Sequence, residues 1–508
     1  MKAAGLSTSA ADASAIEMGR LSRLHRSPKW CGLFLSLFLA GLAGCTVGPN
    51  YHRPAAPAPP SYKEQAVVPT PPPGNWKQAQ PDDAAHRGKW WEVYNDPKLN
   101  SLEEQIAVSN QTLKAAAERY AAAREQIRVV RADKFPSVSA GLGASRVRQS
   151  QTRATYVPGS TTSYGDFLVS GQAAWEPDLW GRVRRSVESA TAIAQASAAE
   201  LANTQLSLQA ELALDYFQLR GLDTQKQLLD STVTAYQRSL ELTKRRFQGG
   251  VASDVDVAQA QTQLDSTRSQ AIDVGLARAQ FEHAIATLIG VPAPSFSLAP
   301  APLDLSLPSV PVGMPSELLE RRPDIAAAER RVQAANAQIG IAISAYYPNI
   351  SLSATGGFES GQIGTWLQGP GGFWALGATA SELLFDAGRR RALTQQSRDN
   401  FEATAADYRQ SVLSSFQEVE DNLAALRILE EESRSEKAAV VSAERSLTLS
   451  TNRYKGGVTS YLEVLTAQTA QLNNQRASAD ITTRQFAASV QLIRAIGGGW
   501  DTSQLPKP

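Results

Sequence analysis

The sequence predicts a mixed, mainly α-helical chain with a two-fold internal repeat, in which each repeat also contributes two β-strands. Three observations predict this fold: long matched stretches, an uneven distribution of proline, and four short segments of alternating side-chain character. The stretches RFQGGVASDVDVAQAQ from Arg246 and RYKGGVTSYLEVLTAQ from Arg453 lie 207 residues apart. This spacing far exceeds the periods of solenoid repeats, which reach about 50 residues. The sequence therefore contains two copies of a unit of roughly 200 residues, an internal repeat.

Other matches follow in the same order along both halves. The string AAAER begins at Ala115 and again at Ala326. KFPSVSAGLGA matches YYPNISLSATG, where Pro136 and Pro348 lie 212 residues apart. These echoes indicate an internal duplication.

The composition excludes several classes of function. A net charge of +1 argues against a dedicated nucleic-acid binder, which would carry a basic patch. Four histidines and two cysteines leave little material for a metal site. The sequence contains no CxxC, HExxH, GxSxG or GxxxxGK[ST] motif. We therefore expect neither enzymatic activity nor a cofactor.

Residues 1–44 have the pattern of a secretory signal peptide. Four basic residues precede the apolar run WCGLFLSLFLAGLAGC, which ends at Cys45. The apolar part is about 14 residues long, shorter than the roughly 20 that a spanning helix needs. The ending Leu-Ala-Gly-Cys resembles a bacterial lipobox, so Cys45 would carry N-acyl and diacylglycerol lipid and begin the mature chain. By the same resemblance, Thr46 favours export to the outer membrane, and either Met1 or Met18 is the start.

Proline divides the chain, because it disrupts helix interiors. Ten of the 27 prolines lie between Pro49 and Pro81, and eight lie between Pro292 and Pro323. The expected divisions are a signal peptide (1–44), a lipid anchor and Pro-rich leader (45–88), a first repeat (89–291), a Pro-rich connector (292–315), a second repeat (316–498) and a C-terminal tail (499–508).

Long helices are expected in the two stretches without proline, residues 178–291 and 371–505. Apolar residues there recur at spacings of three and four, which is typical of coiled-coil packing. A Gly-Gly pair interrupts each stretch and is followed by a serine that can cap a new helix. We therefore expect helix-turn-helix tips with turns at 248–252 and 455–459.

A β-hairpin is expected before each long helix, at residues 135–178 and 347–386. Val138, Ala140 and Leu142 alternate with serine and glycine, and the other three segments alternate similarly. Aromatic residues at several segment ends favour transmembrane strands.

Four strands cannot close a barrel, and an open sheet edge in lipid leaves backbone groups unsatisfied. The barrel must therefore be shared among chains. Two chains would give eight strands, whose interior is filled by side chains. Three chains would give twelve, with room for a pore that the long helices continue.

The chain resembles the TolC-like outer-membrane factors, specifically the NodT-type efflux lipoproteins. The resemblance lies in the lipobox followed by TVGPNYHRP, in KWWEVYNDPKLNSL, in the paired hairpins and in RYKGGVTSYLEVLTAQ. It implies a homotrimer with a 12-stranded outer-membrane barrel and a long α-helical barrel through the periplasm of a Gram-negative bacterium. It also implies a periplasmic adaptor (membrane fusion) protein and an inner-membrane pump, of the resistance-nodulation-division type, that moves drugs or other small toxic molecules.

The resemblance also assigns residues. It places Tyr454, Glu463 and Thr466 at a periplasmic aperture, where three Glu463 side chains would form an acidic ring. Relatives often carry a carboxylate at position 466 and an arginine at position 459, so an ionic latch is in doubt; Asp254 and Asp256 are alternative inter-helix partners. The residues assigned to adaptor docking are Gly249, Gly250, Val251, Gly456, Gly457 and Val458.

Two alternatives remain open. A type I secretion duct shares the architecture but carries polypeptides, although secretion members commonly lack the lipid anchor. A periplasmic coiled-coil scaffold without a pore would explain the helices but would leave the four alternating segments without a role. The sequence does not identify the substrate.

Overall fold

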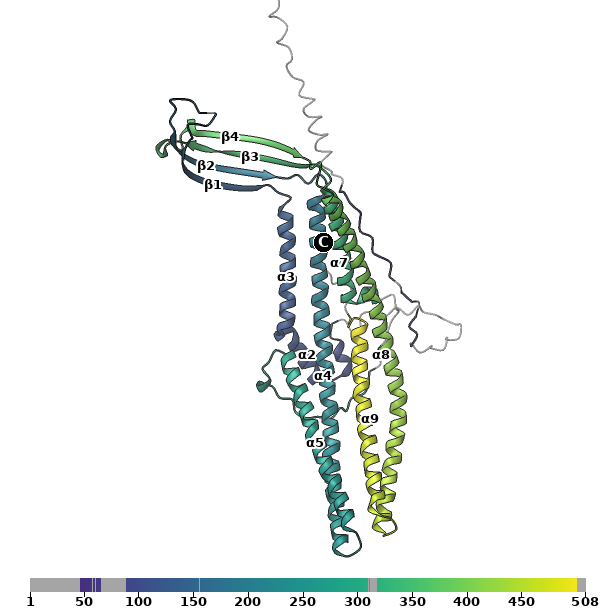
Figure 1. Ribbon diagram of the computed structural model, residues 1–508. Helices are drawn as coiled ribbons and strands as arrows, with labels where there is room; N and C mark the ends of the chain where they lie inside the picture. Colours follow the sequence, from purple (N-terminus) through teal and green to yellow (C-terminus); the bar gives the residue numbers. More distant parts are fainter. Residues whose placement is uncertain are drawn as a thin grey trace, which may run out of the picture.

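The computed structural model describes residues 46–56, 58–59, 61–64, 88–154, 156–308, 310 and 318–499 of the chain. The predicted signal peptide, the predicted lipidation site Cys45, and most of the Pro-rich leader and the tail lie outside these ranges. Long helices run side by side, and a four-stranded sheet projects from one end of them (Figure 1).

The two halves of the chain have matching elements. The first half contains η1 (Trp90–Tyr94), α2 (Pro97–Ser109), α3 (Gln111–Ala132), β1 (Ser137–Arg148), β2 (Ser163–Trp175), α4 (Arg182–Gln248) and α5 (Asp254–Leu288). After η2 (Ala293–Ser295), the second half contains α6 (Leu318–Arg321), α7 (Pro323–Ser344), β3 (Asn349–Ser360), η4 (Ile363–Thr365), η5 (Gly369–Gly371), β4 (Gly372–Ser381), α8 (Arg389–Lys455) and α9 (Tyr461–Ala495). Equivalent helices have equal lengths: 22 residues in α3 and α7, 67 in α4 and α8, and 35 in α5 and α9. The predicted two-fold repeat is confirmed.

Both 67-residue helices begin in the same way. Gly181 and Gly388 precede them in the left-handed conformation, with φ of 83° and 85°. The carboxylate of Asp178 accepts hydrogen bonds from two amides in the first turn of α4, and Asp386 accepts two at the start of α8. At 1.5 Å per residue each helix is about 100 Å long. These helices set the length of the molecule.

The strands form one antiparallel sheet in the order β1-β2-β3-β4. Its register places Val138, Leu142, Val169, Phe358 and Leu376 on one face. Serine, glycine and threonine predominate on the other face, so the predicted alternation is present in all four strands. Among the described residues, β1 and β4 each have one edge without a partner strand.

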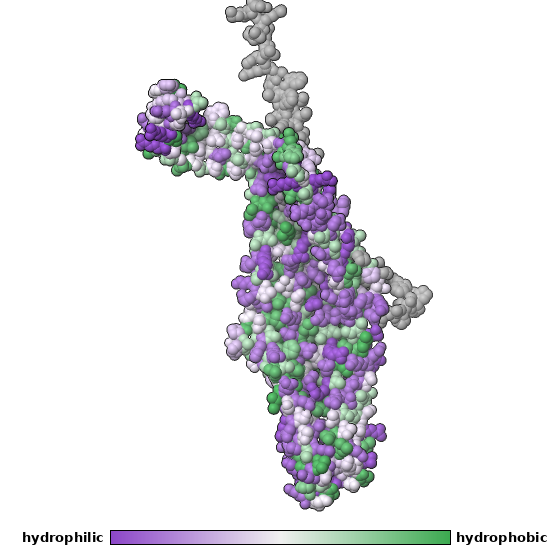
Figure 2. Space-filling view, in the orientation of Figure 1, coloured by the Kyte–Doolittle hydropathy of each residue, from purple (hydrophilic) through white to green (hydrophobic). Residues whose placement is uncertain are grey.

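The apolar face of the sheet is open to its surroundings. Val138, Leu142 and Leu376 are 79%, 77% and 74% exposed. Figure 2 shows pale and green side chains along the sheet and purple side chains at its far tip, whereas the helical body is largely purple. Such exposure of large apolar side chains marks a membrane or protein contact surface.

The largest buried cluster lies midway along the helices. It joins Tyr94 of η1, Phe217 of α4 and Phe486 of α9, with ring centres of Tyr94 and Phe486 both 4.8 Å from that of Phe217. Just after each 35-residue helix, a glycine packs against the backbone at the end of a shorter helix, α2 in the first half and α6 in the second. A Cβ on Gly290 would lie 2.3 Å from the carbonyl oxygen of Ser109, and one on Gly497 would lie 2.1 Å from that of Arg321. Only glycine fits at these two equivalent contacts.

Candidate functional site at the helical tips

The two tips lie at the end of the helical body away from the sheet (Figure 1). At the first tip, the amide of Val251 donates a hydrogen bond to the carbonyl of Arg246 at 2.9 Å. At the second, the amide of Val458 donates to the carbonyl of Arg453 at 3.0 Å. The second glycine of each pair is in the left-handed conformation, with φ of 72° and 75°. Both turns are therefore Schellman-type caps, and this geometry accounts for the repeated glycine pairs.

The residues assigned to docking are all exposed on these turns. Val251 is 67% exposed and Val458 is 71% exposed, although both are apolar. Each valine therefore presents a small apolar surface beside exposed turn backbone. Their exposure is compatible with a protein contact at the tips, and their role in docking remains a prediction.

The helices that follow the turns begin differently. Ser253 and Asp256 form a capping box, in which each side chain accepts a hydrogen bond from the other residue's amide. Ser460 makes no side-chain cap. The Asp256 carboxylate is thus engaged at its own helix start, and Asp254 makes no ion pair or side-chain hydrogen bond within the described chain. Within the described chain, neither aspartate makes a hydrogen bond or an ion pair to α8 or α9.

A buried cluster beneath the tips holds the two helical hairpins together. The Tyr236 hydroxyl donates to the backbone carbonyl of Gln468 at 3.1 Å, which connects α4 with α9. The rings of Tyr454 and Tyr461 meet edge to face with centres 5.5 Å apart. The buried members, from α4, α5, α8 and α9, are Tyr236, Leu240, Ala260, Leu264, Tyr454, Tyr461 and Val464.

Arg246 closes this cluster on the tip side. Its guanidinium carbon lies 4.7 Å from the centre of the Tyr454 ring, and its Nη1 donates to the carbonyl of Lys455 at 3.0 Å. Arginine over an aromatic face is attracted by the ring quadrupole. The hydroxyl of Tyr454 is buried and has no hydrogen-bond partner among the described residues. Tyr454 therefore contributes packing area and a cation-binding face, and its hydroxyl is unpaired in the described chain.

The three predicted aperture residues do not lie together within one chain. Tyr454 is 4% exposed, whereas Glu463 and Thr466 lie on the surface of α9. Glu463 Oε2 lies 3.9 Å from Arg453 Nη1, and the Thr466 hydroxyl donates to a carbonyl of its own helix. Such an exposed ion pair stabilises the fold little, so Glu463 remains available to other groups.

Sequence reasoning missed Arg246, although it is the first residue of the quoted stretch. The available signal was that each repeat has an arginine followed by an aromatic residue just before its turn, Arg246-Phe247 and Arg453-Tyr454. The repeat showed that both arginines end their helices, but only the structure shows that one of them covers the tyrosine of the other hairpin.

At the opposite end, an N-terminal strap (residues 46–56) is fastened to the helical body. The amide of Val47 donates to the carbonyl of Trp180 at 3.1 Å, and Arg185 donates to the carbonyls of Val47 and Gly48. The Tyr51 hydroxyl donates to the Glu329 carboxylate at 2.5 Å. Cys45 itself lies outside the described residues. The strap begins beside the junction between the sheet and the helices.

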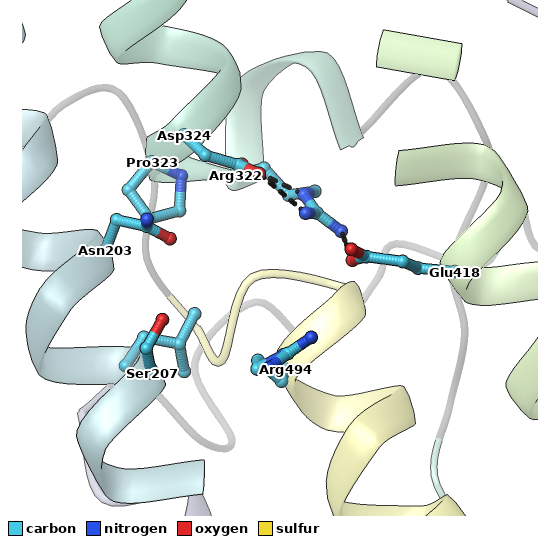
Figure 3. A pocket seen from close by; sticks show the side chains of 8 residues that line it. Asn203, Ser207, Arg322, Pro323, Asp324, Glu418 and Arg494 are labelled. Carbon is cyan, nitrogen blue, oxygen red and sulfur yellow. Dashed lines mark hydrogen bonds and ion pairs between the residues drawn. The ribbon is translucent and has the colours of Figure 1, made fainter. Parts of the chain in front are cut away.

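A polar cavity of about 170 Å³ lies where α7 begins and α9 ends (Figure 3). Arg322 crosses it and binds the carboxylates of Asp324 and Glu418 at 2.6 and 2.8 Å. This buried arginine links α7 to α8, so the cavity belongs to the scaffold. In the described part of the chain, no cluster of three potential metal ligands occurs. Among the described helices, none is long and apolar enough to cross a membrane.

Comparison with known families decides the relationship. The model of the family described as "Outer membrane efflux protein" matches residues 102–291 and 314–498. The chain belongs to the outer membrane efflux protein family.

Members of this family share most of the chain's length. TtgC, a toluene efflux pump outer membrane protein of Pseudomonas putida, is 34% identical over 462 residues, which cover 90% of this chain and 93% of TtgC. OpmQ, a pyoverdine export outer membrane protein of Pseudomonas aeruginosa, is 30% identical over a match that covers 85% of this chain and 92% of OpmQ.

Solved structures of outer membrane channels agree with the fold. The outer-membrane channel OprN is 31% identical with a TM-score of 0.82, and the match covers 90% of this chain and 100% of OprN. The open state of MtrE from Neisseria gonorrhoeae is 27% identical with a TM-score of 0.77, and the match covers 90% of this chain and 98% of MtrE.

Proposed function

We propose that this protein is the outer-membrane exit duct of a tripartite efflux pump in a Gram-negative bacterium. It would conduct small toxic molecules or drugs passively from the periplasm to the exterior, without enzymatic activity. Three chains would form a 12-stranded barrel and a helical barrel beneath it. Family membership supports this assignment, as do the roles of TtgC in toluene efflux and of OpmQ in pyoverdine export.

The open-edged sheet is the observation that carries the proposal. One face is apolar and exposed, and the outer edges of β1 and β4 have no partner strand among the described residues. An unpaired edge in lipid costs several kcal/mol per backbone group, so a single chain is incomplete in a membrane. A periplasmic scaffold would not need such a sheet.

The proposed partners are those that the family resemblance implies. A periplasmic adaptor would dock on the exposed turns around Val251 and Val458, and an inner-membrane pump of the resistance-nodulation-division type would supply substrate. Lipid on Cys45 would hold the strap at the membrane. In a closed trimer, Glu463 from each chain would surround the aperture.

Conductance and export together test the assignment. We expect the purified protein to conduct ions in planar bilayers, and we expect deletion of its gene to increase susceptibility to toxic small molecules in cells that hold the pump and adaptor. Unchanged susceptibility together with loss of a secreted protein would favour a type I secretion duct. Absence of conductance would favour the scaffold.

A further inference from the structure

Charged side chains are sorted between the two faces of the sheet. The four strands contain two arginines and two carboxylates, and these are Arg146, Arg148, Asp166 and Glu359. In β1, every second residue shares the face of Leu142. Both arginines therefore lie on the apolar face of the sheet, at the end of β1 away from the helical body (Figure 1).

Both carboxylates lie on the opposite, polar face. Asp166 pairs with Ser145 of β1. Glu359 pairs with Leu168, which in turn pairs with Gly143 of β1. Ser145 and Gly143 alternate with the arginines and so belong to the polar face. Within the four strands, the apolar face therefore carries two positive charges and no negative charge.

Neither arginine is neutralised within the chain. Arg146 and Arg148 are both exposed, and neither makes an ion pair or a side-chain hydrogen bond with another described residue. The strand does not require cations here, because the counterparts of these positions in the second repeat are Phe358 and Ser360. The two charges therefore remain available to a group outside the chain.

The arginines lie at the level where β1 would leave the hydrocarbon of a membrane. Nine residues of β1 come before Arg146, and a spanning strand needs about 9–11 residues. Phe167, which pairs with Ala144 on the apolar face, has its ring centre 6.3 Å from that of Trp366 in the loop between β3 and β4. Aromatic residues mark the membrane–water interfaces of transmembrane β-barrels. Strand length and aromatic position thus both place Arg146 at head-group level, where Figure 2 shows hydrophilic side chains gathered at the tip of the sheet.

We infer that Arg146 and Arg148 bind the phosphate of an anionic lipid, whose acyl chains lie along the apolar face of β1. The planar guanidinium group donates paired hydrogen bonds to phosphate oxygens. Residues two positions apart on one face of a strand are separated by about 7 Å, so both side chains can approach one head group. Their partners in β2 are Gly165 and Ser163, which are too small to cover them.

The apolar surface next to the arginines favours a lipid over a free anion. Val138 and Leu142 of the same face are 79% and 77% exposed, and β1 presents these apolar residues first and the two cations last. Acyl chains and a phosphate head group follow each other in the same order. This inference rests on the proposed placement of the sheet in the outer membrane, which puts the arginines in its outer leaflet, and adds a lipid ligand to it.

Lipid titration of the full-length protein in detergent tests the site. The probe is lipid A, a phosphorylated glycolipid, and its dephosphorylated form is the matched ligand that keeps the acyl chains. Native mass spectrometry measures the fraction of protein with bound lipid at each concentration. We expect the unmodified protein to bind lipid A about tenfold more tightly than the dephosphorylated form.

Substitutions assign this preference to the two arginines. Arg146→Gln with Arg148→Gln should abolish the preference for the phosphorylated lipid. Arg146→Lys with Arg148→Lys should keep part of it, because lysine retains the charge without the planar fork. Arg238→Gln with Arg245→Gln is the matched control, which removes two exposed arginines of α4 and should bind like the unmodified protein.

Three results would overturn the inference. The first is an unchanged preference for lipid A in the Arg146→Gln, Arg148→Gln variant. The second is an equal loss in the control variant, because net charge alone would then explain binding. The third is equal competition by inorganic phosphate at the concentration of lipid A, because the acyl chains would then contribute nothing.

Bilayer conductance of the unmodified protein separates this inference from the proposed function. A conducting protein that shows no preference for the phosphorylated lipid keeps the duct and loses the lipid site. A protein that binds lipid A through the two arginines but does not conduct keeps the lipid site and loses the duct.

Discussion

The guanidinium of Arg246 covers the ring of Tyr454 at 4.7 Å, so a cation of the first helical hairpin rests on an aromatic side chain of the second. The same guanidinium donates to the carbonyl of Lys455. Cation–π contacts stabilise by about 0.5–2 kcal/mol, and hydrogen bonds from charged donors by about 1.5–3 kcal/mol. An aperture that opens by moving one hairpin away from the other must break both contacts.

Replacing Arg246 should therefore favour the open state. We expect Arg246→Met to keep the packing of the side-chain stem, remove both polar contacts and raise passive conductance in planar bilayers. A loss of about 1–2 kcal/mol corresponds to a 5- to 30-fold change in the opening equilibrium. Arg453→Met is the matched control, because Arg453 ends the other helix and makes only a 3.9 Å ion pair. An equal conductance increase in both variants would contradict the role of Arg246.

Substitutions at Tyr454 separate the ring from its hydroxyl. Tyr454→Ala removes the face that Arg246 covers and leaves a cavity, so we expect higher conductance. Tyr454→Phe keeps the ring and removes only a buried hydroxyl that has no partner in the described chain, so we expect the conductance of the unmodified protein. If Tyr454→Phe also opened the duct, the hydroxyl would have to bind a group of a neighbouring chain.

The contrast between Tyr454 and Arg246 shows what the sequence could predict. Repeat length, glycine caps, strand positions and the place of Tyr454 directly before a tip turn depend on local spacing or on the duplication, so they were predictable. The Arg246–Tyr454 contact depends on how two helical hairpins that are far apart in the sequence pack against each other, and this packing could not be predicted from local spacing. The role of Asp254 and Asp256 as inter-helix partners stays a prediction; within one chain the Asp256 carboxylate accepts a hydrogen bond from the amide of Ser253.

Glu463 should influence which ions pass. Its side chain is 51% exposed, and three copies around an aperture would attract cations. We expect Glu463→Gln to reduce cation preference, measured as a smaller reversal potential across a salt gradient. Glu430→Gln is the control, because Glu430 is also exposed on the helical body but lies away from the tips. Equal effects of the two substitutions would argue for general surface charge.

The attachment of the N-terminal strap to the helical body should depend on the close contact between Gly48 and Gly340. Gly48 has a φ of 94°, and a Cβ there would lie 2.5 Å from the Cα of Gly340. We expect Gly48→Ala to lift the strap and speed its cleavage in limited proteolysis. Gly159→Ala has a similar φ of 90° but open space around the added Cβ. It should therefore show only the left-handed backbone cost of about 1–2 kcal/mol. Equal protease resistance of the Gly48→Ala variant and the unmodified chain would refute the contact.

Glu103 should make stability depend on pH. The side chain is fully buried in α2, and neither carboxylate oxygen has a hydrogen-bond partner among the described residues. Burial raises the pKa of Glu103 well above its usual value, so the folded chain holds this proton more tightly than the unfolded chain. Stability should then fall as pH rises from the ordinary carboxyl pKa, about 4.3, to the raised folded value, and should stay constant above it.

Glu103→Gln mimics the protonated form and should remove this dependence. We expect little change in the unfolding temperature at pH 4 and an increase at pH 8, where the unfolded chain has lost the Glu103 proton and the raised folded pKa therefore lowers the stability of the unmodified protein. Circular dichroism of the helices in detergent at several pH values measures the difference. Glu104→Gln is the control, because Glu104 is exposed and pairs with Lys89, so its effect should be small at both pH values. A gain for Glu103→Gln that is the same at pH 4 and pH 8 would show that folding does not raise the pKa of Glu103.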